Sequence, residues 1–139
     1  MSAPIIRVKD IMHKEVLSID GMASAKDAAT KMRSFKVSEL LVSRRTDDDA
    51  WGIVTEMDLV KGVIIPNRNA EDVFVYEIMT KPVIPVPAQM DIRYAIRLMQ
   101  RIGARRAPVE HMGEFIGMIT LSSLVLNIDI LAGDGEIVR

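Results

Sequence analysis

The sequence predicts a mixed α/β fold built from two similar β-α-β-β-α units. Asp10-Ile11-Met12 is echoed by Glu77-Ile78-Met79 after 67 residues, and the segment 52–55 (Gly-Ile-Val-Thr) is echoed by 117–120 (Gly-Met-Ile-Thr) after 65 residues. Within each copy, short β-rich runs alternate with apolar stripes at helical spacing. A long tandem repeat implies two similar units, so we expect them to be related by a pseudo-twofold axis, with a cleft between them, and packed as one α/β sandwich.

The first copy opens with a strand at residues 16–19, followed by a helix that starts after Ser24. The Ser24 hydroxyl and the Asp27 carboxylate, three residues later, have the spacing of a capping box. The helix carries one apolar stripe at i, i+3, i+4 and i+7, made of Ala25, Ala28, Ala29 and Met32. Residues 40–42 and 51–54 then form two strands joined by a polar connection, and Thr55 starts a second helix that Pro66 stops.

The second copy has the same order of elements. We expect strands at residues 83–86, 107–109 and 115–119, helices at 91–102 and 120–127, and a short hairpin turn at Met112-Gly113. The chain is therefore divided into a first repeat at 8–65, a linker at 66–74, a second repeat at 75–127 and a tail at 128–139. Because a unit of about 60 residues has only a marginal core of its own, we expect the repeats to share one core.

A glycine recurs just ahead of the second helix of each copy. Gly52 and Gly117 hold this position. A residue without a side chain allows close approach, either of another strand or of a ligand.

The bulk composition argues against several classes of protein. The chain has 139 residues, no cysteine and a net charge of −1. Disulfides and cysteine-based metal sites are therefore excluded, and there is no general electrostatic attraction for nucleic acid or for an acidic membrane. No apolar run approaches the roughly 18 residues that span a bilayer, and the first residues lack the pattern of a signal peptide. We expect a cytoplasmic protein.

No pattern typical of a catalytic or metal site stands out. His13 and His111 are isolated, and the three carboxylates at 47–49 diverge at a hairpin tip without a glycine-centred calcium loop. A glycine-rich phosphate loop with a following lysine is also absent from the sequence. The chain is therefore predicted not to be an enzyme and to need no metal or cofactor.

Thr55 and Asp58, at the start of the second helix of the first copy, have two interpretations. Thr55 is placed to cap the helix, and Asp58 lies one turn on, where a carboxylate is favoured and a ligand could be held. A capping box with no ligand has the same spacing, and spacing alone favours this plainer interpretation. The second copy keeps Thr120 but has Ser123 in place of the aspartate.

Taken in order, these motifs resemble those of CBS domains, a family named after cystathionine β-synthase. Asp10-Ile11-Met12 with Val16, and the run from Gly52 to Asp58, are similar to the family's motifs. The second copy matches through Pro82-Val83, Ala107-Pro108-Val109 and the run 117–120, so the resemblance covers residues 8–127. CBS domains come in pairs that commonly bind adenine nucleotides or related adenosyl ligands in their cleft, regulate another protein or domain, and often dimerise.

The resemblance implies roles for particular residues. Thr55 and Asp58 would bind the ribose, whereas Thr120 and Ser123 would form a weaker or empty second site, because serine cannot make a charge-assisted pair of hydrogen bonds. Arg105 and Arg106, which come just before the Pro108 strand of the second copy, would bind a phosphate. The alternative for both arginines is a solvated strand end. The adenine wall would consist of apolar residues for which core packing is the alternative: Val16, Leu17, Ile19 and Ile53.

The resemblance thus implies a regulatory module with one dominant ligand site per chain. The ligand would be AMP, ADP or ATP, or alternatively S-adenosylmethionine or a dinucleotide, and the two arginines modestly favour a phosphate over the sulfonium ligand. We expect a homodimer that signals to a separate effector protein. The alternative is a structural dimerisation module with no nucleotide bound.

Overall fold

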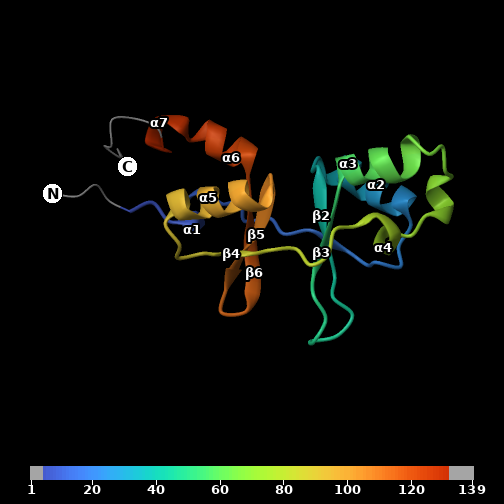
Figure 1. Cartoon of the computed structure of the whole chain (residues 1–139), viewed down its shortest axis with the longest axis horizontal. Coiled ribbons are helices and arrows are strands. Elements are labelled where there is room, and N and C mark those ends of the chain that lie inside the picture. Colours follow the sequence, from blue (N-terminus) through green and yellow to red (C-terminus); the bar gives the residue numbers. More distant parts are fainter. Residues whose placement is uncertain (1–4, 132–139) are drawn as a thin grey trace. The chain divides into compact units, whose positions relative to one another are not determined.

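The structure is a computed structural model that describes residues 5–131. The chain divides into two compact units, of which unit 1 comprises residues 1–16 and 84–139 and unit 2 comprises residues 17–83. Each unit contains one three-stranded sheet and several helices (Figure 1). The predicted mixed α/β class is therefore confirmed.

Unit 2 follows the order predicted for the first copy. Its elements are β1 (Ser18–Ile19), α2 (Ala25–Phe35), β2 (Glu39–Val42), β3 (Gly52–Thr55), α3 (Glu56–Leu59), a π-helical turn (Val60–Ile64), a 3-10 turn (Ala70–Asp72) and α4 (Val75–Ile78). β2 is the central strand, parallel to β1 and antiparallel to β3. The capping box predicted for α2 is present, because the Ser24 hydroxyl accepts from the Asp27 N–H at 3.0 Å and the Asp27 carboxylate accepts from the Ser24 N–H at 3.2 Å.

Unit 1 repeats this arrangement. Its elements are α1 (Val8–Ile11), β4 (Val86–Pro87), α5 (Ile92–Ile102), β5 (Arg106–His111), β6 (Glu114–Thr120), α6 (Leu121–Leu126) and α7 (Ile128–Leu131). The strand expected at 83–86 is reduced to β4, because the prolines at positions 82, 85 and 87 have no N–H to donate to a ladder. The predicted turn joins β5 to β6, with Met112 and Gly113 both at positive φ.

The opening segment of each repeat packs in the unit that contains the rest of the other repeat. In unit 1, His13 and Met118 exchange two backbone hydrogen bonds of 2.8 Å. In unit 2, Thr80 and Ile53 do the same at 2.8 and 2.9 Å. In Figure 1, α1 accordingly lies beside α5 in unit 1, although the two are far apart in the sequence. The compact units and the sequence repeats therefore divide the chain differently.

The recurring glycines allow these segments to approach. A Cβ atom added at Gly117 would lie 2.5 Å from the carbonyl oxygen of His13, and one added at Gly52 would lie 3.1 Å from the carbonyl oxygen of Thr80. Of the two explanations that the sequence left open, close approach of another strand-like segment therefore accounts for both glycines.

Each unit has its own buried core, and each core contains residues from both repeats. In unit 1, Ile6 and Val8 pack among residues of α5, β5 and β6. In unit 2, Val75 packs with Leu40 and Val54. Full burial of an apolar side chain of this size stabilises a fold by about 1.5–3 kcal/mol, so each unit depends on the segment that it receives. The single shared core expected from the sequence is therefore wrong: the buried residues form separate clusters within the two units, and each unit draws on both repeats.

Candidate functional site

The first candidate pair lies where β3 meets α3. Thr55 is the N-cap of α3, and its hydroxyl oxygen accepts from the Asp58 N–H at 3.2 Å. Asp58 Oδ2 accepts from the Thr55 N–H at 2.9 Å and from the Thr55 hydroxyl at 3.1 Å. Both side chains are half-buried. The capping box that the spacing predicts is thus formed.

The carboxylate of Asp58 is only partly used by this cap. Both side-chain hydrogen bonds end on Oδ2, and Oδ1 has no hydrogen-bond partner within residues 5–131. A carboxylate oxygen has room for more than one donor. Oδ1 can therefore accept hydrogen bonds from outside the chain while Oδ2 keeps the helix capped.

The second cap has the same geometry but a different chemistry. Ser123 accepts from the Thr120 N–H at 3.1 Å, and its hydroxyl donates to the Thr120 carbonyl oxygen at 2.7 Å. The Ser123 N–H donates to the Thr120 hydroxyl at 3.2 Å. Ser123 is only 2% exposed. Its one proton is used inside the chain, so this cap offers less to a ligand than Asp58 does.

The two arginines flank the start of β5 in unit 1, whereas Asp58 belongs to unit 2. Arg105 is exposed, and its carbonyl oxygen accepts from the Leu121 N–H at 3.1 Å. Arg106 is half-buried and pairs with Thr120 across the β5–β6 ladder. Pro108 is buried on the same strand, opposite Met118.

The residues predicted to form the adenine wall are mostly engaged with neighbouring strands. Leu17 and Ile19 are half-buried against the core of unit 2, and their carbonyl oxygens accept from β2 and from the residue after it at 3.0 Å. Ile53 is 8% exposed and uses its N–H and carbonyl on Thr80. Val16 is half-buried and falls in unit 1. These residues could therefore contact a base mainly through their side chains.

Unit 2 also has a groove of about 540 Å³ beside the start of α3. It is lined by Ala29, Met32, Arg33, Lys36, Val37, Ser38, Glu56 and Leu59. None of the residues that the sequence predicts for a ligand site lines this groove.

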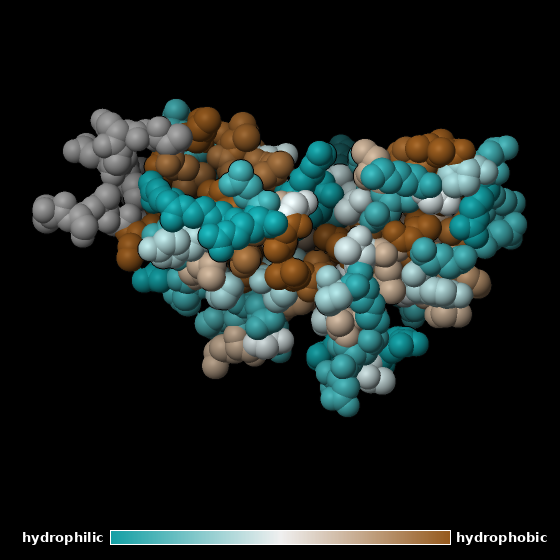
Figure 2. All heavy atoms as spheres, in the orientation of Figure 1, coloured by the Kyte–Doolittle hydropathy of each residue, from teal (hydrophilic) through white to brown (hydrophobic). Residues whose placement is uncertain are grey.

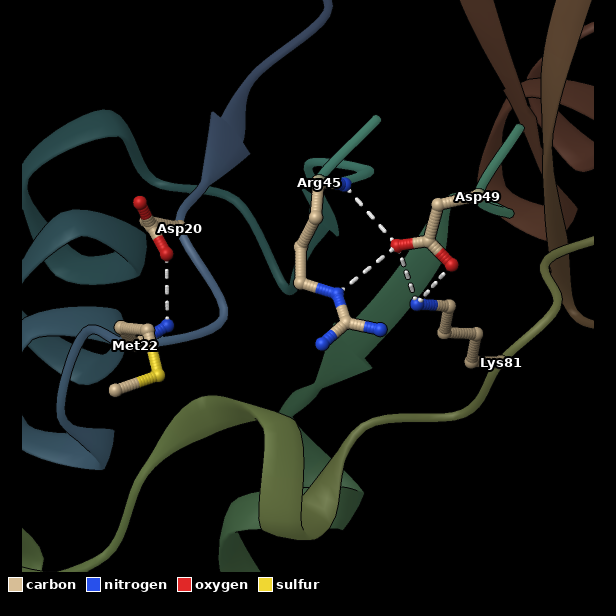
Figure 3. Close-up of polar contacts among 5 residues, drawn as sticks. All are labelled: Asp20, Met22, Arg45, Asp49 and Lys81. Atoms are coloured by element: carbon tan, nitrogen blue, oxygen red, sulfur yellow. Dashed lines mark hydrogen bonds and ion pairs between the residues drawn. The ribbon is translucent and has the colours of Figure 1, made fainter. Parts of the chain in front are cut away.

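The acidic hairpin at 47–49 holds an internal ion-pair cluster. Asp49 accepts from the Lys81 ammonium group at 2.8 Å and from the Arg45 backbone N–H at 3.0 Å (Figure 3). The hydrogen bond from Lys81 makes the largest contribution, and together these bonds hold the pKa of the Asp49 carboxyl well below its usual range. No sequence pattern links Lys81 to this hairpin.

In the described part of the chain, no group of three or more His, Cys, Asp or Glu side chains is arranged to hold a metal ion.

The helices of residues 5–131 include none with both the length and the apolar character needed to cross a membrane.

Comparison with known proteins identifies the repeat. The family model for the CBS domain matches twice, at residues 8–64 and 75–129. MK0525 of Methanopyrus kandleri, named as an uncharacterized protein, is 31% identical over 121 residues, which are 86% of this chain and 61% of that protein. The chain thus spans about three-fifths of that relative's length.

Solved structures show the same fold. The hexameric CBS-CP12 protein from bloom-forming cyanobacteria superposes with a TM-score of 0.87 at 32% identity, over 96% of this chain and 77% of that one. A CBS-domain protein from Burkholderia ambifaria superposes with a TM-score of 0.79 at 27% identity, over 96% of this chain and 100% of that one.

Proposed function

The chain belongs to the CBS domain family, and we propose that it is a regulatory module that binds an adenosine-bearing ligand and signals to a separate partner protein. The ligand that we propose is an adenine nucleotide, AMP, ADP or ATP, with S-adenosylmethionine or a dinucleotide as alternatives. The role assigned to the chain is binding, with no catalytic step.

The difference between Asp58 and Ser123 is the observation that supports a ligand at the first cap. Asp58 carries a charge and keeps Oδ1 without a hydrogen-bond partner in the described chain, while Ser123 donates its only hydroxyl proton to Thr120. Two neighbouring ribose hydroxyls need a strong acceptor, and a carboxylate provides charge-assisted hydrogen bonds. We therefore assign the ribose to Thr55 and Asp58 and propose one dominant site per chain.

The phosphate is assigned to Arg105 and Arg106 of the second repeat. A guanidinium group matches phosphate with two parallel hydrogen bonds and stays charged at every physiological pH. A double-mutant cycle between Asp58→Ser and Arg105→Gln measures whether the two residues act on the same ligand, because independent sites give additive losses of binding free energy.

We also propose that the chain forms a homodimer or a larger symmetric assembly. The hexamer described for the CBS-CP12 protein, which has 32% identity to this chain, supports self-association. Size-exclusion chromatography with light scattering at micromolar concentration is expected to give a mass of at least two chains, and a monomer would contradict the dimer.

A thermal-shift panel tests ligand binding. It would contain AMP, ADP, ATP, S-adenosylmethionine and a dinucleotide. A ligand at a hundred times its dissociation constant is expected to stabilise the protein by about 2.7 kcal/mol. Asp58→Ser removes the carboxylate but keeps a capping side chain, as Ser123 does in the second repeat. Loss of charge-assisted hydrogen bonds worth about 1.5–3 kcal/mol is expected to weaken binding roughly ten- to hundredfold.

The matched control is Asp27→Ser, which makes the same change in the capping box of α2. It is expected to leave the ligand-induced shift in place. Equal shifts for Asp58→Ser and the unchanged protein would contradict the assignment of the ribose. If no ligand in the panel produced a shift, the structural dimerisation module would be the better description.

A further inference from the structure

A row of exposed arginines runs along α5. Arg93, Arg97 and Arg101 recur every four residues, and all three are exposed; we call them the arginine row. Residues 92–109 contain these three and two further arginines, with no acidic residue, in a chain whose net charge is −1. Figure 2 shows a strongly hydrophilic band over α5 on the face of unit 1 turned to the viewer.

The fold does not require this charge. The matching positions of α2, 67 residues earlier, are Lys26, Thr30 and Ser34. Lys26 pairs with Glu71 at 2.6 Å, so the equivalent helix in unit 2 carries no row of unneutralised cations. Two helices with the same role in the same fold thus differ on their outer faces, which points to a local function for the row.

The arginines of the row are oriented without being neutralised. The Arg93 guanidinium donates to the Leu131 carbonyl oxygen of α7 at 3.4 Å. The Arg97 guanidinium lies 5.7 Å from the centre of the Tyr94 ring, a cation–π contact. No ion pair joins any of the three to an acidic side chain within residues 5–131. Within the described residues, no salt bridge therefore cancels their positive charge, which can act on an anion.

We propose that the arginine row docks an acidic segment of a partner protein, with carboxylates at helical spacing. Successive arginines lie about 6 Å apart along the helix axis, which is also the distance between residues i and i+4 of a partner helix. Each guanidinium fork can take one carboxylate with two hydrogen bonds. The row and the acidic helix thus match in charge and in period.

Other polyanions fit less well. The apolar face of α5, with Ile92, Ala95 and Met99, is buried in the core of unit 1, so the helix has no apolar face to insert into a membrane. The whole chain is slightly acidic, which disfavours nucleic acid. None of the three arginines is assigned to the nucleotide, so peptide binding by the row is expected without added nucleotide.

Fluorescence anisotropy with the full chain tests this surface. The probe is a labelled peptide of about 20 residues, long enough to be helical, with glutamate at every fourth position. We expect binding that weakens as salt is raised. Arg97→Glu with Arg101→Glu is expected to weaken it about tenfold or more. Arg97→Gln with Arg101→Gln is expected to give a smaller loss in the same direction.

The charge-matched control is Lys14→Glu with Lys61→Glu, two exposed cations outside α5, and it is expected to bind the probe as the unchanged protein does. The glutamate variant of the row is expected to bind a peptide with lysine at every fourth position better than the unchanged protein does. The surface assignment is overturned if the control loses as much affinity as the row variant. Absence of peptide binding overturns it too, as does tighter binding to duplex DNA or to vesicles of phosphatidylcholine with phosphatidylserine.

Discussion

At the scale of single residues, the Thr55–Asp58 and Thr120–Ser123 caps have similar geometry but leave different groups available to a ligand. Asp58 closes its cap with one carboxylate oxygen, whereas Ser123 is buried and both donates to and accepts from Thr120. A buried hydroxyl that satisfies backbone groups is a stabilising group, because its removal leaves those groups without partners. Ser123 therefore contributes to the fold of unit 1, whereas Asp58 is the residue that we propose contacts the ligand.

Ser123→Ala is expected to lower the free energy of unfolding by about 1 kcal/mol, the usual net contribution of a side-chain hydrogen bond. Ligand affinity is expected to stay the same, because the proposed dominant site lies at the other cap. Urea denaturation measures the first effect and titration calorimetry the second. A loss of affinity as large as that of Asp58→Ser would place Ser123 in the ligand site.

Both caps are visible in the sequence, because a capping box depends on residues three apart. Which oxygen of Asp58 stays available is not visible there, since it depends on the side-chain rotamer. The arginine row shows the same limit. Its spacing of four can be read from the sequence, but the absence of an acidic partner in the described chain emerges only when neighbouring elements such as α7 are in place.

At the scale of elements, the long hairpin between β2 and β3 is tied to the segment that follows α4. Asp49 makes this connection through Lys81, and its side chain is only 17% exposed. Because the folded-state pKa of Asp49 lies below its ordinary value of 3.8, the carboxylate stabilises the fold above about pH 4. This contribution is lost as the pH falls through the folded-state pKa.

Asp49→Asn is therefore expected to lower the melting temperature at pH 7, and the difference from the unchanged protein is expected to shrink as the pH falls below about 4. Asp48→Asn makes the same charge change at an exposed neighbour, so it serves as the control. Melting curves from pH 7 to pH 3 for the three proteins test this. A difference that stays constant over the range, or equal effects of both variants, would contradict the role of Lys81.

Most elements could be predicted because their signals are local. The capping box and apolar stripe predict α2, and the Met112-Gly113 pair predicts the tight turn between β5 and β6. The opening strands were harder to predict, since a run of β-formers at 16–19 pairs over only two residues in β1. The ladder extends only where β2 offers partners, and this is a property of the sheet.

At the scale of the whole molecule, the exchange of opening segments makes each compact unit draw on both repeats. Unit 2 needs residues 75–80 to complete its core and to pair with Ile53 through Thr80, yet these residues belong to the second repeat. The repeat is plain in the sequence, but nothing in it tells which copy a segment will pack against, because both copies carry nearly the same motif.

Fragments of the chain test whether the compact unit or the sequence repeat folds by itself. A fragment of residues 17–83 is expected to unfold cooperatively, because it contains all of unit 2. A fragment of residues 8–65, a complete sequence repeat, is expected to be largely unfolded, since it lacks Val75 and the Thr80 bridge. Circular dichroism during urea titration compares them. A cooperative transition for residues 8–65 alone would show that the exchanged segment is dispensable.

Titration calorimetry of the full chain with the ligand that gives the largest thermal shift tests the central claim most directly. We predict one site per chain, with affinity reduced roughly ten- to hundredfold by Asp58→Ser and unchanged by Asp27→Ser. Two equal and independent sites per chain, or full affinity after Asp58→Ser, would contradict it.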